Sequence, residues 1–239
     1  MLYIAYLPKS KGEHITERKV NRILKWYTNL TGNKYSIIAS PGYLSTTNNS
    51  IDIFLHELSG VLTAGFNRKI GFLNGMNGHH NTSSGGTIID EHNRKLSLYN
   101  FNQIVLNPKK EYDHRKMMCF FAEKGNTYSE ITLENLESFL DDVYIGAILI
   151  GSSNQSKTTY FDDFAKKGEA DIFMFDLTED SCCEHTLEQV LFENRSDDYG
   201  LSSDDNIVIT KSFFGKGHTD SQEFLKSILK ETLINGLDK

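Results

Sequence analysis

The sequence has little proline and cysteine and almost no tryptophan: 3 prolines, 3 cysteines and 1 tryptophan in 239 residues. The cysteines, of which Cys182 and Cys183 are adjacent, are too few and too badly spaced for a disulfide framework, which favours a reducing cytoplasm. The longest apolar run, from Val143 to Ile150, is far shorter than the roughly 20 residues of a membrane helix. The first residues lack the basic and apolar segments of a signal peptide. We therefore expect a cytoplasmic protein without a membrane span.

Common metal and nucleotide motifs are also missing. Leu55-His56-Glu57-Leu58 lacks the second histidine of a zincin, and Gly215-Lys216-Gly217 lacks the spacing of a P-loop. Cys182-Cys183-x-His185 is too sparse for a structural zinc site. The paired His79 and His80 lie in a polar, glycine-rich segment, where they are either solvent-exposed or touch a substrate or bind a metal, and solvent exposure is the usual case. We expect no metal and no cofactor.

What is present is a charge asymmetry along the chain. Residues 1–60 carry 7 basic and 4 acidic side chains, and residues 61–124 carry 9 and 5. Residues 125–239 carry 9 basic and 23 acidic side chains, which makes the overall net charge −7. A basic first half can present a face to phosphate groups, while a merely solvated acidic surface is the plain alternative.

Hydrophobic periodicity predicts alternating strands and helices. Strands are expected at 2–6, 35–40, 69–73, 101–106, 115–121, 145–150, 170–175 and 207–210. Helices are expected at 17–30, 50–62, 133–140 and 221–233, the third of them exposed because its surroundings are rich in Asp and Glu. This alternation indicates an α/β layered domain whose apolar strands are covered on both faces.

Three short motifs follow one another on neighbouring strands. His114-x-Lys116 leads into an apolar strand, and alternate residues of a strand share one face. A neutral imidazole can attack phosphorus, and an ammonium can hold phosphate oxygens. Gly151-Ser152-Ser153-Asn154 ends a second strand, where small residues let the backbone approach an anion. Glu169 opens a third strand, and its carboxylate can fix the tautomer of a histidine.

In this order the motifs resemble the phospholipase D superfamily, over roughly residues 100–176. The resemblance implies a phospholipase D-like α/β layered sandwich with a mixed central sheet flanked by helices. It implies that His114 is the nucleophile, that Lys116 and Asn154 bind the phosphate, and that Glu169 orients a histidine. The substrate-binding residues expected around them are Ser152, Ser153, Arg115 and Lys157. A catalytic domain is then expected at 1–176, followed by an acidic extension at 177–239 that ends in a helix packed on the same domain.

Two departures from the family pattern shape the functional interpretation. The position five residues after the lysine, where the family often has Asp, is Phe121, as in the branch of metal-independent endonucleases that the motif resembles most. Residues 125–142 form an acidic insertion, and we expect that this insertion could gate the site. Because the family's site uses two His-x-Lys motifs and this chain has one, we expect a homodimer that shares one active site.

The sequence therefore predicts a metal-independent nuclease that cleaves nucleic acid, with DNA favoured over RNA, through a phosphohistidine intermediate and with a role in bacterial restriction or phage defence. The alternatives are a phospholipid phosphodiesterase or transferase, and a non-catalytic subunit that holds a partner such as an ATPase or a specificity protein through its acidic tail. Basic residues expected to follow a nucleic-acid backbone are Arg94, Lys95, Lys109, Lys110, Arg115, Lys157, Lys166 and Lys167.

Overall fold

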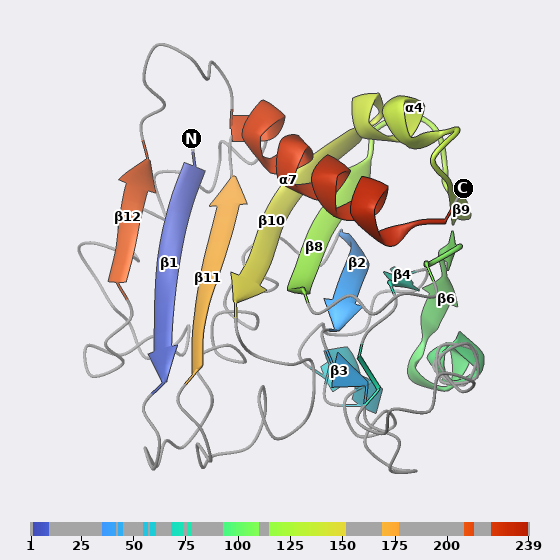
Figure 1. Ribbon diagram of the computed structural model, residues 1–239, viewed down its shortest axis with the longest axis horizontal. Helices are drawn as coiled ribbons and strands as arrows, with labels where there is room; N and C mark the ends of the chain where they lie inside the picture. Colours follow the sequence, from blue (N-terminus) through green and yellow to red (C-terminus); the bar gives the residue numbers. More distant parts are fainter. Residues whose placement is uncertain are drawn as a thin grey trace.

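The structure, a computed structural model, describes residues 2–9, 35–41, 43–44, 55–56, 58–60, 68–73, 76–77, 93–109, 115–151, 169–176, 208–212 and 221–238. Its centre is a mixed sheet of 8 strands in the order β12-β1-β11-β10-β8-β2-β4-β6 (Figure 1). These strands are β1 (Leu2–Lys9), β2 (Ser36–Pro41), β4 (Arg68–Phe72), β6 (Phe101–Gln103), β8 (Lys116–Glu123), β10 (Val143–Gly151), β11 (Glu169–Asp176) and β12 (Val208–Ser212). The expected α/β class with a mixed central sheet is confirmed.

Smaller elements surround the sheet. Two pairs of short parallel strands lie outside it: β3 (Tyr43–Leu44) with β5 (Met76–Asn77), and β7 (Val105–Leu106) with β9 (Glu130–Ile131). The named helical elements are η1 (Ser97–Tyr99), α4 (Leu136–Asp141) and α7 (Ser221–Gly236). The helix expected at 17–30 lies outside the described residues, and of the one expected at 50–62 only residues 55–56 and 58–60 are described, as helix.

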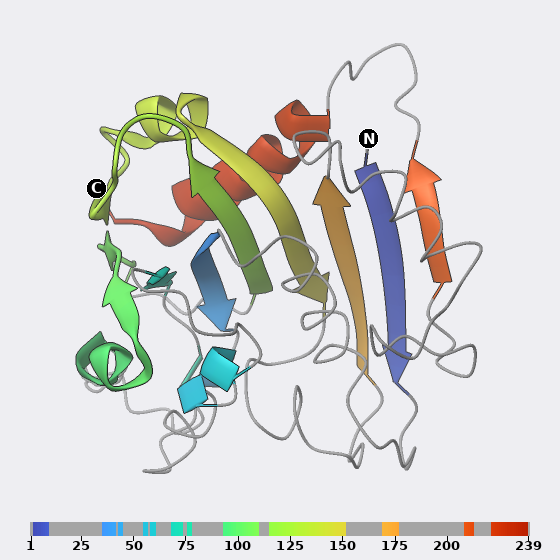
Figure 2. The ribbon, with the colours of Figure 1, turned by 180° about the vertical axis from the view of Figure 1, so that it is seen from behind.

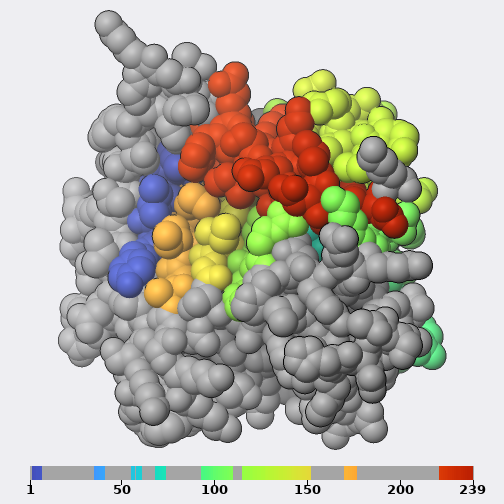
Figure 3. Space-filling model, viewed as in Figure 1, coloured from blue at the N-terminus to red at the C-terminus, as the bar shows by residue number. Residues whose placement is uncertain are grey.

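One face of the sheet, which we call the helix face, is covered by α4 and α7 (Figure 1). α7 buries Leu225, Leu229 and Leu233, which recur every four residues and form one apolar stripe. Figure 3 shows that α7 covers this face only in part, since atoms of β1, β11 and β10 are visible beside the helix. The C-terminal helix therefore belongs to the same core as the strands.

The opposite face, which is turned toward the viewer in Figure 2, carries aromatic side chains of β1, β10 and β11 and of Tyr35 just before β2, and we call it the aromatic face. Tyr3 stacks on Phe175 at 5.3 Å between ring centroids, and Phe175 lies 5.4 Å from Phe173. Tyr35 and Tyr144 form a second stacked pair at 6.4 Å. All of these rings are buried, so the aromatic face is covered, whereas Tyr6 and Ile172 on the helix face are exposed. The expectation of strands covered on both faces therefore holds only in part.

The N-terminal end of α7 is held by hydrogen bonds to β10 and β11. The Ser221 hydroxyl and the Gln222 amide both donate hydrogen bonds to the buried carboxylate of Asp176. Gln222 also donates to the carbonyl of Ile145 at 2.8 Å and accepts from its N–H at 2.9 Å. Because the register of β10 and β8 shifts between Ile145 and Ala147, Gln222 satisfies backbone groups at this irregularity.

Two expectations need correction. The helix at the acidic insertion is not exposed: α4 buries Leu136, Phe139 and Leu140, whose spacing of three and four places them on one stripe. The strand expected at 101–106 breaks at Ile104, whose N–H donates to the Ile70 carbonyl at 2.9 Å. After this break the chain leaves β4 and pairs with β9 instead.

Candidate active site

The three strands that carry the sequence motifs are neighbours in the sheet. β10 lies between β8 and β11 and is antiparallel to both. The start of β8 at Lys116, the end of β10 at Gly151 and the start of β11 at Glu169 therefore fall at one end of the sheet. We call this the motif end, and the opposite end the far end. The end of β2 joins the motif end, since Pro41 pairs with Lys116.

Strand register aligns single residues of these strands. Gly151 pairs with Asp171 of β11. On its other side the β10–β8 register runs to Ile150 and Met117, so the next position places Gly151 opposite Lys116. Met117 faces α7, where its sulfur contacts the Thr232 hydroxyl at 3.5 Å. Lys116 consequently lies on the aromatic face, as does Asp171, which alternates with Phe173 and Phe175.

Asp171 is buried, with 1% of its surface exposed. Its carboxylate lies directly over Gly151, because a Cβ added at Gly151 would collide with Asp171 Oδ1. The motif end thus combines a cationic and an acidic side chain, Lys116 and Asp171, on one face and in one row. Sequence reasoning missed Asp171, although its spacing of two from Glu169 places both on the same face of β11.

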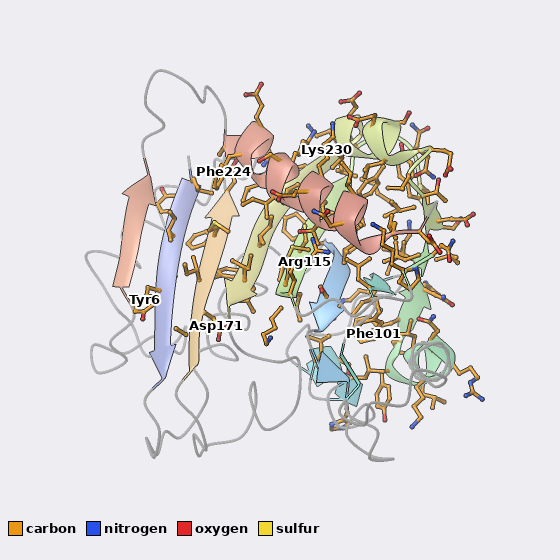
Figure 4. The ribbon with its side chains drawn as sticks, viewed as in Figure 1. Tyr6, Phe101, Arg115, Asp171, Phe224 and Lys230 are labelled. Carbon is orange, nitrogen blue, oxygen red and sulfur yellow. The ribbon has the colours of Figure 1, made fainter. Side chains whose placement is uncertain are left out.

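Arg115 takes a different direction from Lys116. Its Nη2 lies 3.4 Å from the position of a Cβ at Gly236, the last residue of α7. Figure 4 shows Arg115 beside the last turns of α7. A guanidinium at this place interacts favourably with the carbonyl end of a helix. Its own carbonyl accepts a hydrogen bond from the buried Ser40 hydroxyl at 2.9 Å, which ties the start of β8 to β2.

Several expected site residues lie outside the described residues: His114, Ser152, Ser153, Asn154 and Lys157. The described chain resumes one residue after His114 and stops one residue before Ser152. Glu169 is described in its backbone, which pairs with Lys9 of β1. His79, His80, Cys182 and Cys183 are also outside, as are Lys110, Lys166 and Lys167 among the basic residues.

The acidic insertion does not lie near the motif end. α4 and β9 connect the end of β8 to the start of β10, and both of these points are at the far end of the sheet. The prediction that residues 125–142 gate the site is therefore wrong, because the length of β8 separates these residues from Lys116. Instead, Leu136, Phe139 and Leu140 of α4 contribute to the core on the helix face.

Within the described ranges, no three His, Cys, Asp or Glu side chains gather at a spacing that could hold a metal ion. In the same part of the chain, no helix is long and apolar enough to cross a membrane. No family model matches the sequence, and a search of curated proteins finds no significant relative.

Proposed function

We propose that the protein is a phosphodiesterase of the phospholipase D type, and specifically a metal-independent endonuclease that acts on DNA. The observation that carries the proposal is the adjacency of β8, β10 and β11, with Lys116, Gly151 and Glu169 at the same end of the sheet. Lys116 and Glu169 are 53 residues apart in the sequence, so it is the pairing of the strands that brings the motifs to one end of the sheet. A phosphate held there can be reached from all three strands.

The chemistry follows from the residues of the motif. A ring nitrogen of neutral His114 attacks the phosphorus, forming a P–N bond while the P–O bond to the leaving group breaks. Lys116 and Asn154 stabilise the charge on the non-bridging oxygens, which grows in the transition state. Water then attacks the phosphohistidine, and breaking of the P–N bond returns the histidine to its neutral form. Glu169 orients a histidine throughout both steps.

The leaving oxygen needs a proton, and one chain supplies only one His-x-Lys motif. In the proposed homodimer, His114 of the partner subunit is the general acid, and the two-fold axis passes through the shared site. The general acid gives up its proton in the first step and recovers one from the attacking water in the second.

The test is cleavage of supercoiled plasmid and of single-stranded DNA in excess EDTA, with the oligomeric mass measured in parallel. We expect cleavage by the wild type, none by His114→Ala, and unchanged cleavage by His56→Ala. His56 is a matched control, since it is an exposed histidine of a helical segment away from the motif strands, with its ring 6.2 Å from that of Tyr99. A covalent ³²P label on the wild-type chain that is labile to acid would identify the phosphohistidine.

Loss of cleavage in EDTA, or equal cleavage by His114→Ala, would contradict this proposal. The same protein would then be tested on phospholipid vesicles, which separates a lipid phosphodiesterase of the same chemistry from a non-catalytic subunit. In the cell, we propose that the protein acts in the cytoplasm, in restriction or phage defence, together with a partner ATPase or specificity protein.

A further inference from the structure

Arg68 is a buried cation at the far end of the sheet, opposite to the end that carries Lys116. It is the first residue of β4, and 8% of its surface is exposed. It pairs with Phe101 of β6, and the register of β4 with β2 places Tyr35 on its other side. Both neighbours are buried aromatic residues, and Figure 4 labels Phe101. Arg68 therefore lies on the aromatic face between two rings that offer no counter-charge.

The Nε and Nη2 atoms of Arg68 have no hydrogen-bond partner. Within the described part of the chain, Arg68 also forms no ion pair. The adjacent Lys69 shows the contrast. Its Nζ lies 2.7 and 2.8 Å from the two carboxylate oxygens of Glu123 and 3.2 Å from the Tyr128 carbonyl. The same strand thus pairs one cation fully on the helix face and leaves the other unsatisfied on the aromatic face.

An unsatisfied buried guanidinium is energetically costly, since its charge loses water without gaining a partner. Burial lowers the pKa of Arg68 from its usual value, yet an arginine side chain stays protonated in proteins. The charge must therefore be compensated by an anion. Nε and Nη2 together form the edge of a guanidinium that binds two oxygens of one carboxylate or phosphate in parallel.

We propose that Arg68 binds a phosphate group side-on through Nε and Nη2, at a site separate from the proposed active site. The sequence on both sides of Arg68 also favours phosphate over a carboxylate, because residues 61–124 as a whole have a basic excess, with 9 Lys or Arg and 5 Asp or Glu. A dianion balances this excess more fully than a monoanion does. The site does not depend on nuclease activity, because Arg68 is at the opposite end of the sheet from Lys116.

The test is thermal unfolding with inorganic phosphate titrated at constant ionic strength against chloride. A ligand at about a hundred times its Kd shifts the unfolding equilibrium about a hundredfold, so the wild-type midpoint should rise with phosphate concentration. Arg68→Met should abolish this rise and, without phosphate, should be no less stable than the wild type, because an uncompensated charge has been removed. Arg68→Lys keeps the charge but loses the bidentate edge, so it should bind phosphate at least tenfold more weakly.

Lys69→Met is the matched control, one residue away and on the other face. It should lower the midpoint, since it breaks the pair with Glu123, but should keep the full response to phosphate. A nucleoside monophosphate and an oligonucleotide without terminal phosphates identify the source: a response to the first alone indicates a terminal phosphate group, and an Arg68-dependent response to both indicates a phosphodiester. No response in the wild type, or a response in Arg68→Met as large as in the wild type, would overturn the proposal.

Discussion

The carboxylate of Asp171 occupies the space into which any side chain at position 151 would have to project. The backbone of β11 is equally close, since a Cβ at Gly151 would lie 2.5 Å from the Ala170 carbonyl oxygen and 2.6 Å from the Asp171 Cα. Position 151 at the end of β10 therefore needs glycine, because β11 fills the space that a side chain would occupy. This close approach holds β10 and β11 together at the point where the expected phosphate-binding turn begins.

Gly151→Ala should destabilise the protein by about 1–3 kcal/mol, because strand backbone cannot move aside as a flexible side chain can. Chemical denaturation would measure the change in the free energy of unfolding. Gly60→Ala is the control: it is helical, nothing lies within 4 Å of its Cβ position, and it should be neutral or stabilising by about 0.5–1 kcal/mol. Equal effects at the two positions would contradict the close approach.

Lys116→Met and Arg115→Met should separate catalysis from stability. Loss of the ammonium at the motif end should reduce kcat in the nuclease assay by about 10²–10³, with little effect on folding. Arg115 lies at the carbonyl end of α7, so its loss should lower the free energy of unfolding by about 0.3–1 kcal/mol and spare most of the turnover. Rate and denaturation measurements on both variants would check this, and a turnover loss as large for Arg115→Met would show that Arg115 binds substrate.

Gln222→Ala should cost about 1–3 kcal/mol of stability, because it leaves the N–H and carbonyl of the buried Ile145 without their partner. The Asp176 carboxylate loses one of its donors at the same time. Urea denaturation would measure the loss. Ser227→Ala, which removes an exposed hydroxyl bonded to the Phe224 carbonyl, should change stability by less than about 0.5 kcal/mol.

Cys119 should resist alkylation in the native protein. Burial raises the pKa of its thiol, so the reactive thiolate does not form at pH values where a free cysteine ionises. Mass spectrometry of the peptide after iodoacetamide treatment, with and without urea, would measure this. Because the folded pKa is the higher one, the neutral thiol contributes stability below the unfolded pKa of about 8.5, and this contribution declines as the pH rises above it.

Cys119→Ala should accordingly show a shallower loss of stability between neutral and alkaline pH than the wild type. Labelling of native Cys119 as rapid as in urea would contradict the buried environment. The adjacent pair Cys182 and Cys183 gives an internal comparison in the same digest.

The sequence predicts well those elements whose pattern is set by local burial. β8, β10, β11 and α7 are found within three residues of their expected bounds, because the strands are continuous apolar runs and the apolar residues of the helix recur every three or four positions. α4 was expected on the surface because the segment around it is rich in Glu and Asp, although Leu136, Phe139 and Leu140 already have helical spacing. The order of the strands, by contrast, depends on contacts between distant segments that no local period records.

The candidate site divides in the same way. The motif residues could be placed at strand ends from the sequence, and register then explains why Lys116 and Asp171 share a row. The burial of Asp171 could not be predicted, since it depends on Gly151 leaving space on the neighbouring strand. Arg68 is similar: it stands just before the strand expected at 69–73, and the absence of a hydrogen-bond partner for its Nε and Nη2 appears only in the structure, where it lies beside Phe101 of β6.

The pairing of β1 has a consequence for the order of folding. β1 lies between β11 and β12, so Leu2 pairs with Asp176 on one side and with Ser212 on the other. During synthesis β1 emerges before both of its sheet neighbours and has no partner in the sheet until residues 169–176 have left the ribosome. Closing so long a stretch of chain makes this step slow, and the unpaired strand exposes backbone groups that can join another chain in the meantime. Because β1 and its two neighbours pair late, the main hazard for this chain is aggregation before folding is complete, rather than low stability of the folded protein.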